Sequence, residues 1–168
     1  MTSLVKVGDP IPSVPAKLVD ASGIADATSD EVLGHGRVVF FTVPGAFTPT
    51  CDTNHLPGFL ANAAKIRAAG VGRIVCGSTN DHHVMKAWAT ASEALGAIDF
   101  LADGNGLLAK ALGLDKDMTG SGMGVRFARS AMLIREGIVE AVFVEEKRGE
   151  VTGSGAPAIL LALQALAA

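Results

Sequence analysis

Short apolar runs rich in β-branched residues alternate along this chain with segments in which apolar residues recur at helical spacing. The strand-like runs cover residues 37–43, 72–78, 98–101, 130–135 and 138–144. The intervening patterns predict helices beginning near residues 51, 80 and 104, and a last helix that opens near Pro157. This alternation favours an α/β fold in which helices flank both faces of a central sheet.

Turn and capping residues refine several of these boundaries. Glu136-Gly137 separates the last two strands and predicts a hairpin. Asn80 and Asp81 are both suited to cap the helix that follows the 72–78 strand. Pro57-Gly58 falls inside the helical pattern that begins at residue 51, and a proline there removes a hydrogen bond and clashes with the preceding turn. We therefore expect a kink or break at this point.

Length, charge and hydropathy limit the classes of protein to which this chain can belong. The 168 residues predict one domain over residues 1–168. The net charge of −3, without a block of like charges, argues against nucleic acid as a partner. No apolar run approaches the roughly 18 residues that a membrane-spanning helix needs, and the first residues lack the apolar core of a signal peptide. We therefore expect a cytoplasmic protein with no membrane partner.

One of the two cysteines, Cys51, falls where a helix is expected to begin. The buried run 37–43 stops at Pro44-Gly45, after which Thr48 suits the N-cap and Pro49 the first helical position. A sulfur in the first turn lies near unpaired backbone N–H groups at the positive end of the helix dipole, and such a position favours the thiolate. Cys51 is therefore a candidate nucleophile, the alternative being a small buried hydrophobe in a capped helix.

Two further side chains are candidates to converge on Cys51. Thr48 lies three residues earlier, where its hydroxyl can cap the helix, orient a small ligand, or do both. Arg129 precedes an apolar strand, and a guanidinium on a covered face needs an anion. The Cys51 thiolate would serve, as would the carboxylate of Glu140 or Glu145, and the pattern alone leaves the partner open.

The second cysteine and the histidines carry weaker signals. Cys76 lies inside a predicted buried strand, so it is either a structural thiol or a resolving cysteine that forms a disulfide with oxidised Cys51. Such a disulfide needs Cα atoms within about 7 Å of each other. His55 follows Cys51 by one helical turn, where it either touches the pocket or simply packs. His82-His83 shows no metal-ligand spacing, and we interpret the pair as surface or cap residues.

The run Pro44-Gly-Ala-Phe-Thr-Pro-Thr-Cys51 resembles the peroxidatic Pro-x-x-x-Thr-x-x-Cys motif of the peroxiredoxins. Residues 74–81, 85–88 and 124–129 are similar to the type II or peroxiredoxin-5 branch, and the likeness extends from Val7 to the last helix. The resemblance implies a thioredoxin-like fold, with a central mixed sheet flanked by helices, and the activity of an antioxidant thiol peroxidase in cell redox homeostasis.

The resemblance also implies residue roles and partners. Cys51 corresponds to the peroxidatic nucleophile, Thr48 to the hydroxyl that orients the peroxide, Pro44 to a shield over the sulfur, Arg129 to the active-site arginine and Arg126 to a supporting basic residue. The implied substrate is hydrogen peroxide or an alkyl hydroperoxide, and the implied mechanism requires neither a metal nor an organic cofactor. The implied reductant is glutaredoxin with glutathione, or thioredoxin, and the implied assembly is a homodimer.

Two departures from the family pattern bear on this interpretation. The loop at residues 150–156 lacks the cysteine that resolves the sulfenic acid in many members, and Ser130 follows Arg129 where an aromatic residue is common.

Two other functions compete with a peroxidase. A thioredoxin-like disulfide reductase normally has a second cysteine two residues after the first, where this chain has Thr53. A redox sensor would pass the oxidation of Cys51 to a partner protein.

Overall fold

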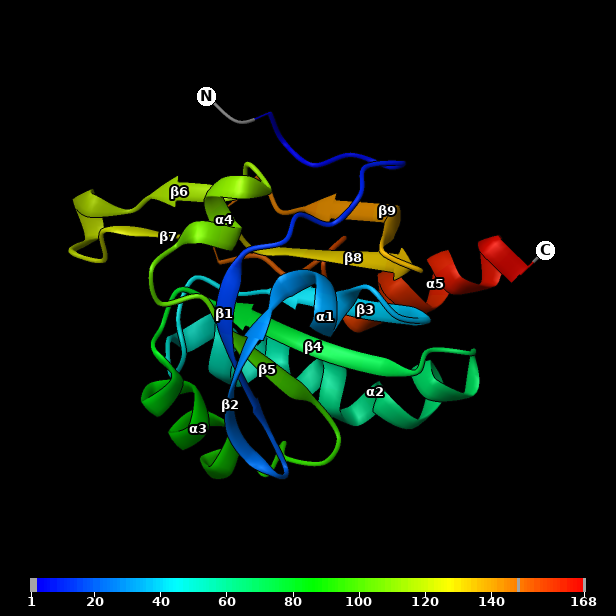
Figure 1. Ribbon diagram of the computed structural model, residues 1–168, viewed down its shortest axis with the longest axis horizontal. Helices are drawn as coiled ribbons and strands as arrows, with labels where there is room; N and C mark the ends of the chain where they lie inside the picture. The colour runs from blue at the N-terminus through cyan, green and yellow to red at the C-terminus, as the bar shows by residue number, and fades with distance from the viewer. Residues whose placement is uncertain (1–2, 148, 168) are drawn as a thin grey trace.

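The computed structural model describes residues 3–147 and 149–167. Its centre is a seven-stranded sheet in the order β2-β1-β5-β4-β3-β8-β9 (Figure 1). The strands are β1 (Pro15–Asp20), β2 (Gly23–Thr28), β3 (Arg37–Thr42), β4 (Arg73–Ser78), β5 (Asp99–Ala102), β8 (Ser130–Arg135) and β9 (Ile138–Val144). β4 pairs in parallel with both β3 and β5, whereas the outer pairings are antiparallel. The sheet is therefore mixed, as the sequence predicts.

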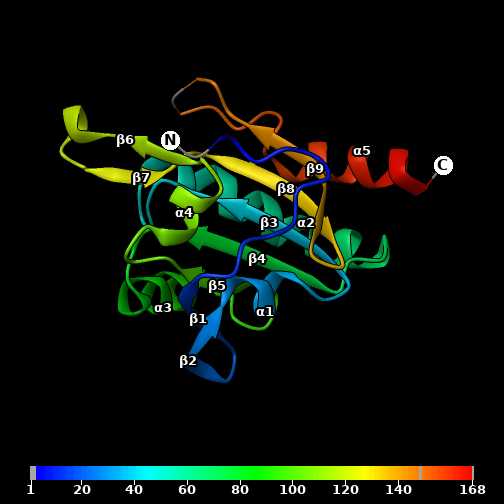
Figure 2. The ribbon, with the colours of Figure 1, turned by 45° about the horizontal axis from the view of Figure 1, so that its top comes forward.

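Helices cover both faces of this sheet. They are α1 (Ser29–Leu33), α2 (Leu56–Ala68), α3 (His82–Ala91), α4 (Leu107–Ala111) and α5 (Ala156–Ala167). α2, α3 and α5 contribute to one apolar cluster, and α1 and α4 contribute to the other. Figures 1 and 2 show α1 and α2 on opposite sides of the central strands. Among the described residues, no helix is both long and apolar enough to cross a membrane.

The central strand β3 divides its side chains between the two apolar clusters. Val39 and Phe41 face the α2 side, whereas Val38 and Phe40 face the α1 side. Because successive side chains of a strand point to opposite faces, a strand buried on both faces reads as one continuous apolar run. This is why residues 37–43 could be identified as a central strand.

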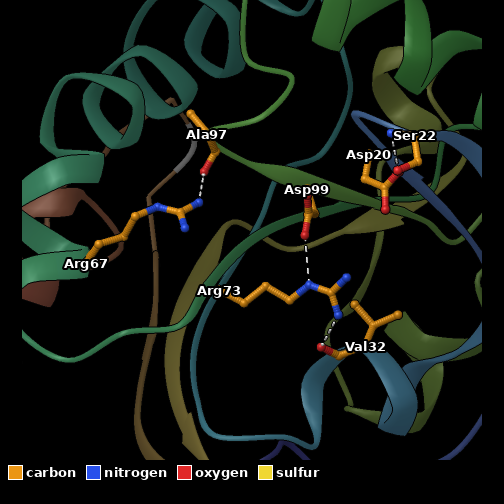
Figure 3. A network of polar contacts seen from close by, with 7 residues as sticks. All are labelled: Asp20, Ser22, Val32, Arg67, Arg73, Ala97 and Asp99. Carbon is orange, nitrogen blue, oxygen red and sulfur yellow. Dashed lines mark hydrogen bonds and ion pairs between the residues drawn. The ribbon is translucent and has the colours of Figure 1, made fainter.

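A polar network fastens the amino ends of β4 and β5, away from the end of β3 that leads to Cys51 (Figure 3). The Arg73 Nε donates to Asp99 Oδ2 at 2.7 Å, and its Nη1 donates to the Val32 carbonyl at 3.1 Å. Nearby, the Arg67 Nη2 donates to the Ala97 carbonyl at 2.6 Å. Arg73 thereby ties α1, β4 and β5 together.

Specific contacts show which of the predicted capping and turn residues fill those roles. Asp81 caps α3, because its Oδ1 accepts the Val84 N–H at 2.9 Å. The Asn80 Oδ1 instead accepts the Ala46 N–H at 2.8 Å, in the loop that leads to Cys51. Glu136 and Gly137, with φ of 49° and 78°, form the predicted hairpin between β8 and β9.

A small second sheet lies apart from the main one. It pairs β6 (Asp115–Asp117) with β7 (Val125–Phe127), and a 3₁₀ turn at Thr119–Ser121 lies between the two strands. This ribbon extends from the end of the molecule opposite α5 (Figures 1 and 2). Neither short strand was expected from the sequence, and the glycine-rich residues 120–124 lie in the connection between them.

Candidate active site

Cys51 opens a π-helical turn, Cys51–His55, that runs directly into α2. The Leu56 N–H donates to the Cys51 carbonyl, five residues back. Pro57, in the first turn of α2, has no N–H to offer Thr53, the partner that an α-helical residue at this position would use. The expected break is therefore a wider turn inside a continuous helix, which is a known way for a helix to absorb a local disruption.

Thr48 lies directly before the first helical residue, and its carbonyl accepts the Asp52 N–H at 2.9 Å. Its hydroxyl donates to the Gly45 carbonyl at 2.6 Å and does not cap the helix, so the side-chain cap expected from the sequence is wrong. Because the hydroxyl proton is engaged, the lone pairs of Oγ1 remain to accept a hydrogen bond from a ligand. Thr48 is therefore oriented as an acceptor.

Arg129 supplies the cation beside Cys51. Its Nη2 donates to Cys51 Sγ at 3.3 Å, and its Nη1 lies 3.1 Å from His55 Nδ1. Arg129 is 8% exposed and Cys51 is fully buried. A guanidinium at this distance in a buried site can stabilise negative charge on the sulfur.

The two carboxylates that were alternative partners for Arg129 are engaged elsewhere. Glu140 accepts from Arg37 Nε and Nη2, at 3.1 and 3.2 Å. Glu145 accepts from the backbone N–H and the hydroxyl of Thr152, each at 2.6 Å to Oε1. Among the described residues, no carboxylate lies within 4.0 Å of the Arg129 guanidinium, and the structure thus places Arg129 on Cys51.

His55 connects Arg129 to the loop before α5. Its Nε2 lies 2.8 Å from the Ser154 carbonyl, which only accepts, so Nε2 carries the proton and Nδ1 accepts from Arg129. Burial lowers the pKa of His55 to about 4, and the ring is therefore neutral at pH 7. The ring packs against Phe41 and Phe59, at centroid distances of 5.1 and 5.6 Å. The two sequence-based alternatives for His55, packing and pocket contact, are both present.

Pro44 lies in the loop that follows β3, and Arg126 reaches this loop from β7. The Arg126 Nε donates to the Met123 carbonyl at 2.8 Å, and its Nη1 lies 3.4 Å from the Pro44 carbonyl. Pro44, Thr48 and Arg129 all line a cavity of about 250 Å³. Arg129 thus both lines the cavity and contacts the sulfur, whereas Arg126 supports the loop that carries Pro44.

Cys76 lies in the interior of β4, where it is fully buried and faces Phe41 of β3 and Phe100 of β5 in register. Burial raises the pKa of the Cys76 thiol, so the thiol is protonated at neutral pH. Both cysteines are free. The structure therefore holds two thiols in very different settings, one beside a cation and one inside a strand.

Two contacts near the site were not predicted. The Trp88 Nε1 donates to Asp52 Oδ1 at 2.7 Å and so joins α3 to the residue after Cys51. Ser130, which departs from the aromatic residue expected after Arg129, places its hydroxyl 2.6 Å from that of Thr42. Each pairing joins residues at least 36 apart in the chain, which no local pattern signals.

Within the described ranges, no group of three His, Cys, Asp or Glu side chains is arranged to hold a metal ion.

Comparison with known proteins places these features in a family. The redoxin family model matches residues 6–160. The chain is 43% identical to peroxiredoxin-2C of Oryza sativa subsp. japonica over 160 residues, which span 95% of this chain and 98% of that protein. Among solved structures, reduced Prx3 from Vibrio vulnificus in complex with hydrogen peroxide has a TM-score of 0.88 and 39% identity, covering 96% of this chain and 97% of that one. Peroxiredoxin 5 from Alvinella pompejana has a TM-score of 0.83 and 31% identity, covering 96% and 99%.

Proposed function

This chain belongs to the type II peroxiredoxins, thiol-dependent peroxidases of thioredoxin-like fold with a peroxidatic cysteine at Cys51, and we propose that it reduces both hydrogen peroxide and organic hydroperoxides. The observation that supports this proposal most directly is the 3.3 Å contact between Arg129 Nη2 and Cys51 Sγ beside a cavity of about 250 Å³. A buried cation that touches a thiol at the start of a helix is the environment that a nucleophilic thiolate needs.

The reaction begins when the Cys51 thiolate attacks one peroxide oxygen. The S–O bond forms as the O–O bond breaks, and the sulfur loses the two electrons that the peroxide gains. The leaving oxygen takes up a proton and departs as water or an alcohol, and Cys51 becomes a sulfenic acid. Thr48 Oγ1 accepts the hydrogen bond of the peroxide hydroxyl, and Arg129 stabilises the charge that develops on the oxygens. In other enzymes such a donor contributes about 2.7–4 kcal/mol.

His55 acts in this scheme as a positioning residue. Its neutral ring accepts from Arg129 Nη1 while its Nε2–H is held by the Ser154 carbonyl, so the guanidinium has one preferred orientation toward the sulfur. A protonated ring would have no lone pair at Nδ1 to offer. The lowered pKa of His55 keeps this acceptor available at neutral pH.

The reductant that we propose is glutathione with glutaredoxin, or thioredoxin. A thiolate of the reductant attacks the Cys51 sulfur, the sulfenic oxygen leaves as water, and a second thiol of the reductant then releases Cys51 from the mixed disulfide. In this proposal Cys76 stays in β4 and takes no part, because its thiol is buried and protonated.

We further propose a homodimer in the cytoplasm. The names of the relatives place some in other compartments, since peroxiredoxin-2E-2 of Oryza sativa is chloroplastic and peroxiredoxin-2F of Arabidopsis thaliana is mitochondrial. Sedimentation of the purified protein tests the dimer, and imaging of the tagged full-length protein in its own cells tests the compartment. A monomer at micromolar concentration would contradict the first, and an organellar signal the second.

The central test is peroxide consumption by wild type, Cys51→Ser and Cys76→Ser, with glutaredoxin plus glutathione and with thioredoxin in parallel. We expect turnover in wild type and Cys76→Ser and none in Cys51→Ser. Normal turnover in Cys51→Ser would refute the mechanism. A single round of oxidation with no turnover under any reductant would favour a redox sensor, and reduction of insulin disulfides would favour a disulfide reductase.

A further inference from the structure

The β6–β7 ribbon places two cations side by side. Lys116 and Arg126 lie directly opposite each other in its antiparallel register, so their side chains emerge on the same face. Like charges in this arrangement destabilise a strand pair unless an anion lies between or beside them. Among the described residues, neither has a carboxylate within 4.0 Å, although Arg37 and Arg73 do. The pair therefore has the composition of an anion-binding site.

The same ribbon borders the cavity beside Cys51. Lys116 lines that cavity together with Lys147, and both side chains are exposed to solvent. Among the described residues, Glu145 is the one acidic residue in the cavity lining, and both of its carboxylate oxygens accept hydrogen bonds from Thr152. The lining thus holds more cationic than acidic side chains in a chain whose net charge is −3, although Lys147 Nζ also lies 3.9 Å from Glu150 Oε1, outside the lining.

Apolar side chains form another part of the same cavity lining. Pro49, Met118 and Met123 belong to it together with Pro44. Methionine adapts its shape to an irregular hydrocarbon ligand and offers no strong hydrogen bond to water or to hydrogen peroxide. A cavity that needed to admit only hydrogen peroxide would gain nothing from such a lining, whereas a carbon chain would be desolvated by it.

We propose that this protein selects organic hydroperoxides that carry a carboxylate, with the carboxylate held at Lys116, Arg126 and Lys147 and the hydroperoxide group delivered to Cys51. The proposal rests on the peroxidase function proposed above. The carboxylate is unchanged in the reaction, which remains attack of the Cys51 sulfur on the O–O bond with release of the corresponding alcohol. The cations contribute by raising the local concentration of the anionic substrate and by orienting it.

The test uses a series of tertiary alkyl hydroperoxides with a terminal carboxylate at increasing chain length, each compared with its methyl ester. The Cys51 thiol that remains after single-turnover oxidation is measured by rapid-quench alkylation and mass spectrometry, so no reductant is involved. The readout is the ratio of acid to ester rate constants, in which a general loss of activity cancels. At the best chain length we expect this ratio to be about 10 in wild type, which corresponds to about 1.4 kcal/mol of discrimination.

Variants identify the residues that produce this ratio. Lys116→Gln should reduce it about threefold, and the Lys116→Gln, Lys147→Gln double variant should bring it close to one. Added salt should lower the wild-type ratio, because rim charges are screened at a Debye length of about 8–10 Å. Lys65→Gln is the matched control: it removes the same charge from an exposed site in the last turn of α2 and should leave the ratio unchanged.

A wild-type ratio near one at every chain length, with normal oxidation by hydrogen peroxide, would overturn this proposal and leave the peroxidase function standing. A ratio that the lysine variants do not change would also overturn it. The rate at which glutathione reduces the Cys51 sulfenic acid can likewise be compared with the rate for glutathione diethyl ester. If the lysine variants alter only this second ratio, the anion that the site binds is the reductant, and the proposal is wrong. Failure of hydrogen peroxide to oxidise Cys51 would remove the peroxidase function and this proposal together.

Discussion

Two substitutions of His55 separate its contact with Arg129 from its contact with the loop before α5. Asn places its amide oxygen close to the position of Nδ1, so His55→Asn can still accept from Arg129 but loses the donor to Ser154. Gln places its amide nitrogen close to Nε2, so His55→Gln can still donate to Ser154 but loses the acceptor. Both variants lose the same ring packing against Phe41 and Phe59, and each is therefore the control for the other.

The expected effect follows from the contact that each variant removes. A hydrogen bond to a charged group contributes about 1.5–3 kcal/mol, and each 1.4 kcal/mol is a factor of about 10 in rate. If His55 orients Arg129 toward the reacting sulfur, His55→Gln should lower the rate constant with hydrogen peroxide by about 10- to 100-fold. His55→Asn should stay within about threefold of wild type, because the 3.1 Å contact with Arg129 is replaced and not lost.

The assay is the second-order rate constant for oxidation of Cys51, measured without reductant, together with the free energy of unfolding in urea. Both variants should be destabilised by similar amounts, since each loses one hydrogen bond and the same ring. Equal rate constants in the two variants would refute the positioning role. A larger loss in His55→Asn would show that the loop contact with Ser154 is the one that supports the reaction.

Four other predictions follow from the same site. Thr48→Val should slow oxidation by about 100-fold and Thr48→Ser by less than about fivefold, so equal rates would limit the hydroxyl to its contact in the turn. Arg129→Met should slow both peroxide oxidation and alkylation of Cys51 at pH 7, and unchanged alkylation would make Arg129 structural. One equivalent of peroxide should leave the Cys76 thiol free by mass spectrometry; a rapid Cys51–Cys76 disulfide would contradict this. The pKa of His55 is about 4 in the folded protein and 6.5 ordinarily, so as the pH falls the unfolded chain takes up the proton first. The free energy of unfolding should therefore fall by about 2 kcal/mol from pH 7 to pH 5. That decrease should be smaller in His55→Asn, and an equal decrease would assign it to other groups.

The parts of the fold that the sequence predicts are those with strong local patterns. β3, β4 and β8 are buried on both faces and read as continuous apolar runs, and the 2-residue turn at Glu136-Gly137 has the left-handed backbone that a tight hairpin needs. The edge hairpin of β1 and β2 was missed because its strands are only partly buried. β6 was missed because its three residues, Asp-Lys-Asp, carry no apolar signal.

In the active site, too, features set by a local motif could be predicted, and features set by residues distant in the chain could not. The motif from Pro44 to Cys51 is local, and the expected placement of Thr48 before the helix and of Cys51 in its first turn could be read from it. The orientation of Arg129 and the tautomer of His55 could not, because His55 meets partners 74 and 99 residues away in the chain. Whether Glu140 or Glu145 would neutralise Arg129 likewise depended on Arg37 and Thr152, which compete for those carboxylates.

The burial of Cys76 has a consequence for how the protein responds to its surroundings. In the proposed cycle the second thiol stays enclosed in β4, so an oxidised Cys51 is reduced only by thiols from outside the chain, and collisions with them set its lifetime. Two bimolecular reactions then compete for the same sulfenic acid: capture by an external thiol, and a second peroxide that drives it irreversibly to the sulfinic acid. The fraction of molecules lost in each cycle depends on the ratio of peroxide to thiol, so accumulated sulfinic acid would record the history of that ratio in the cell.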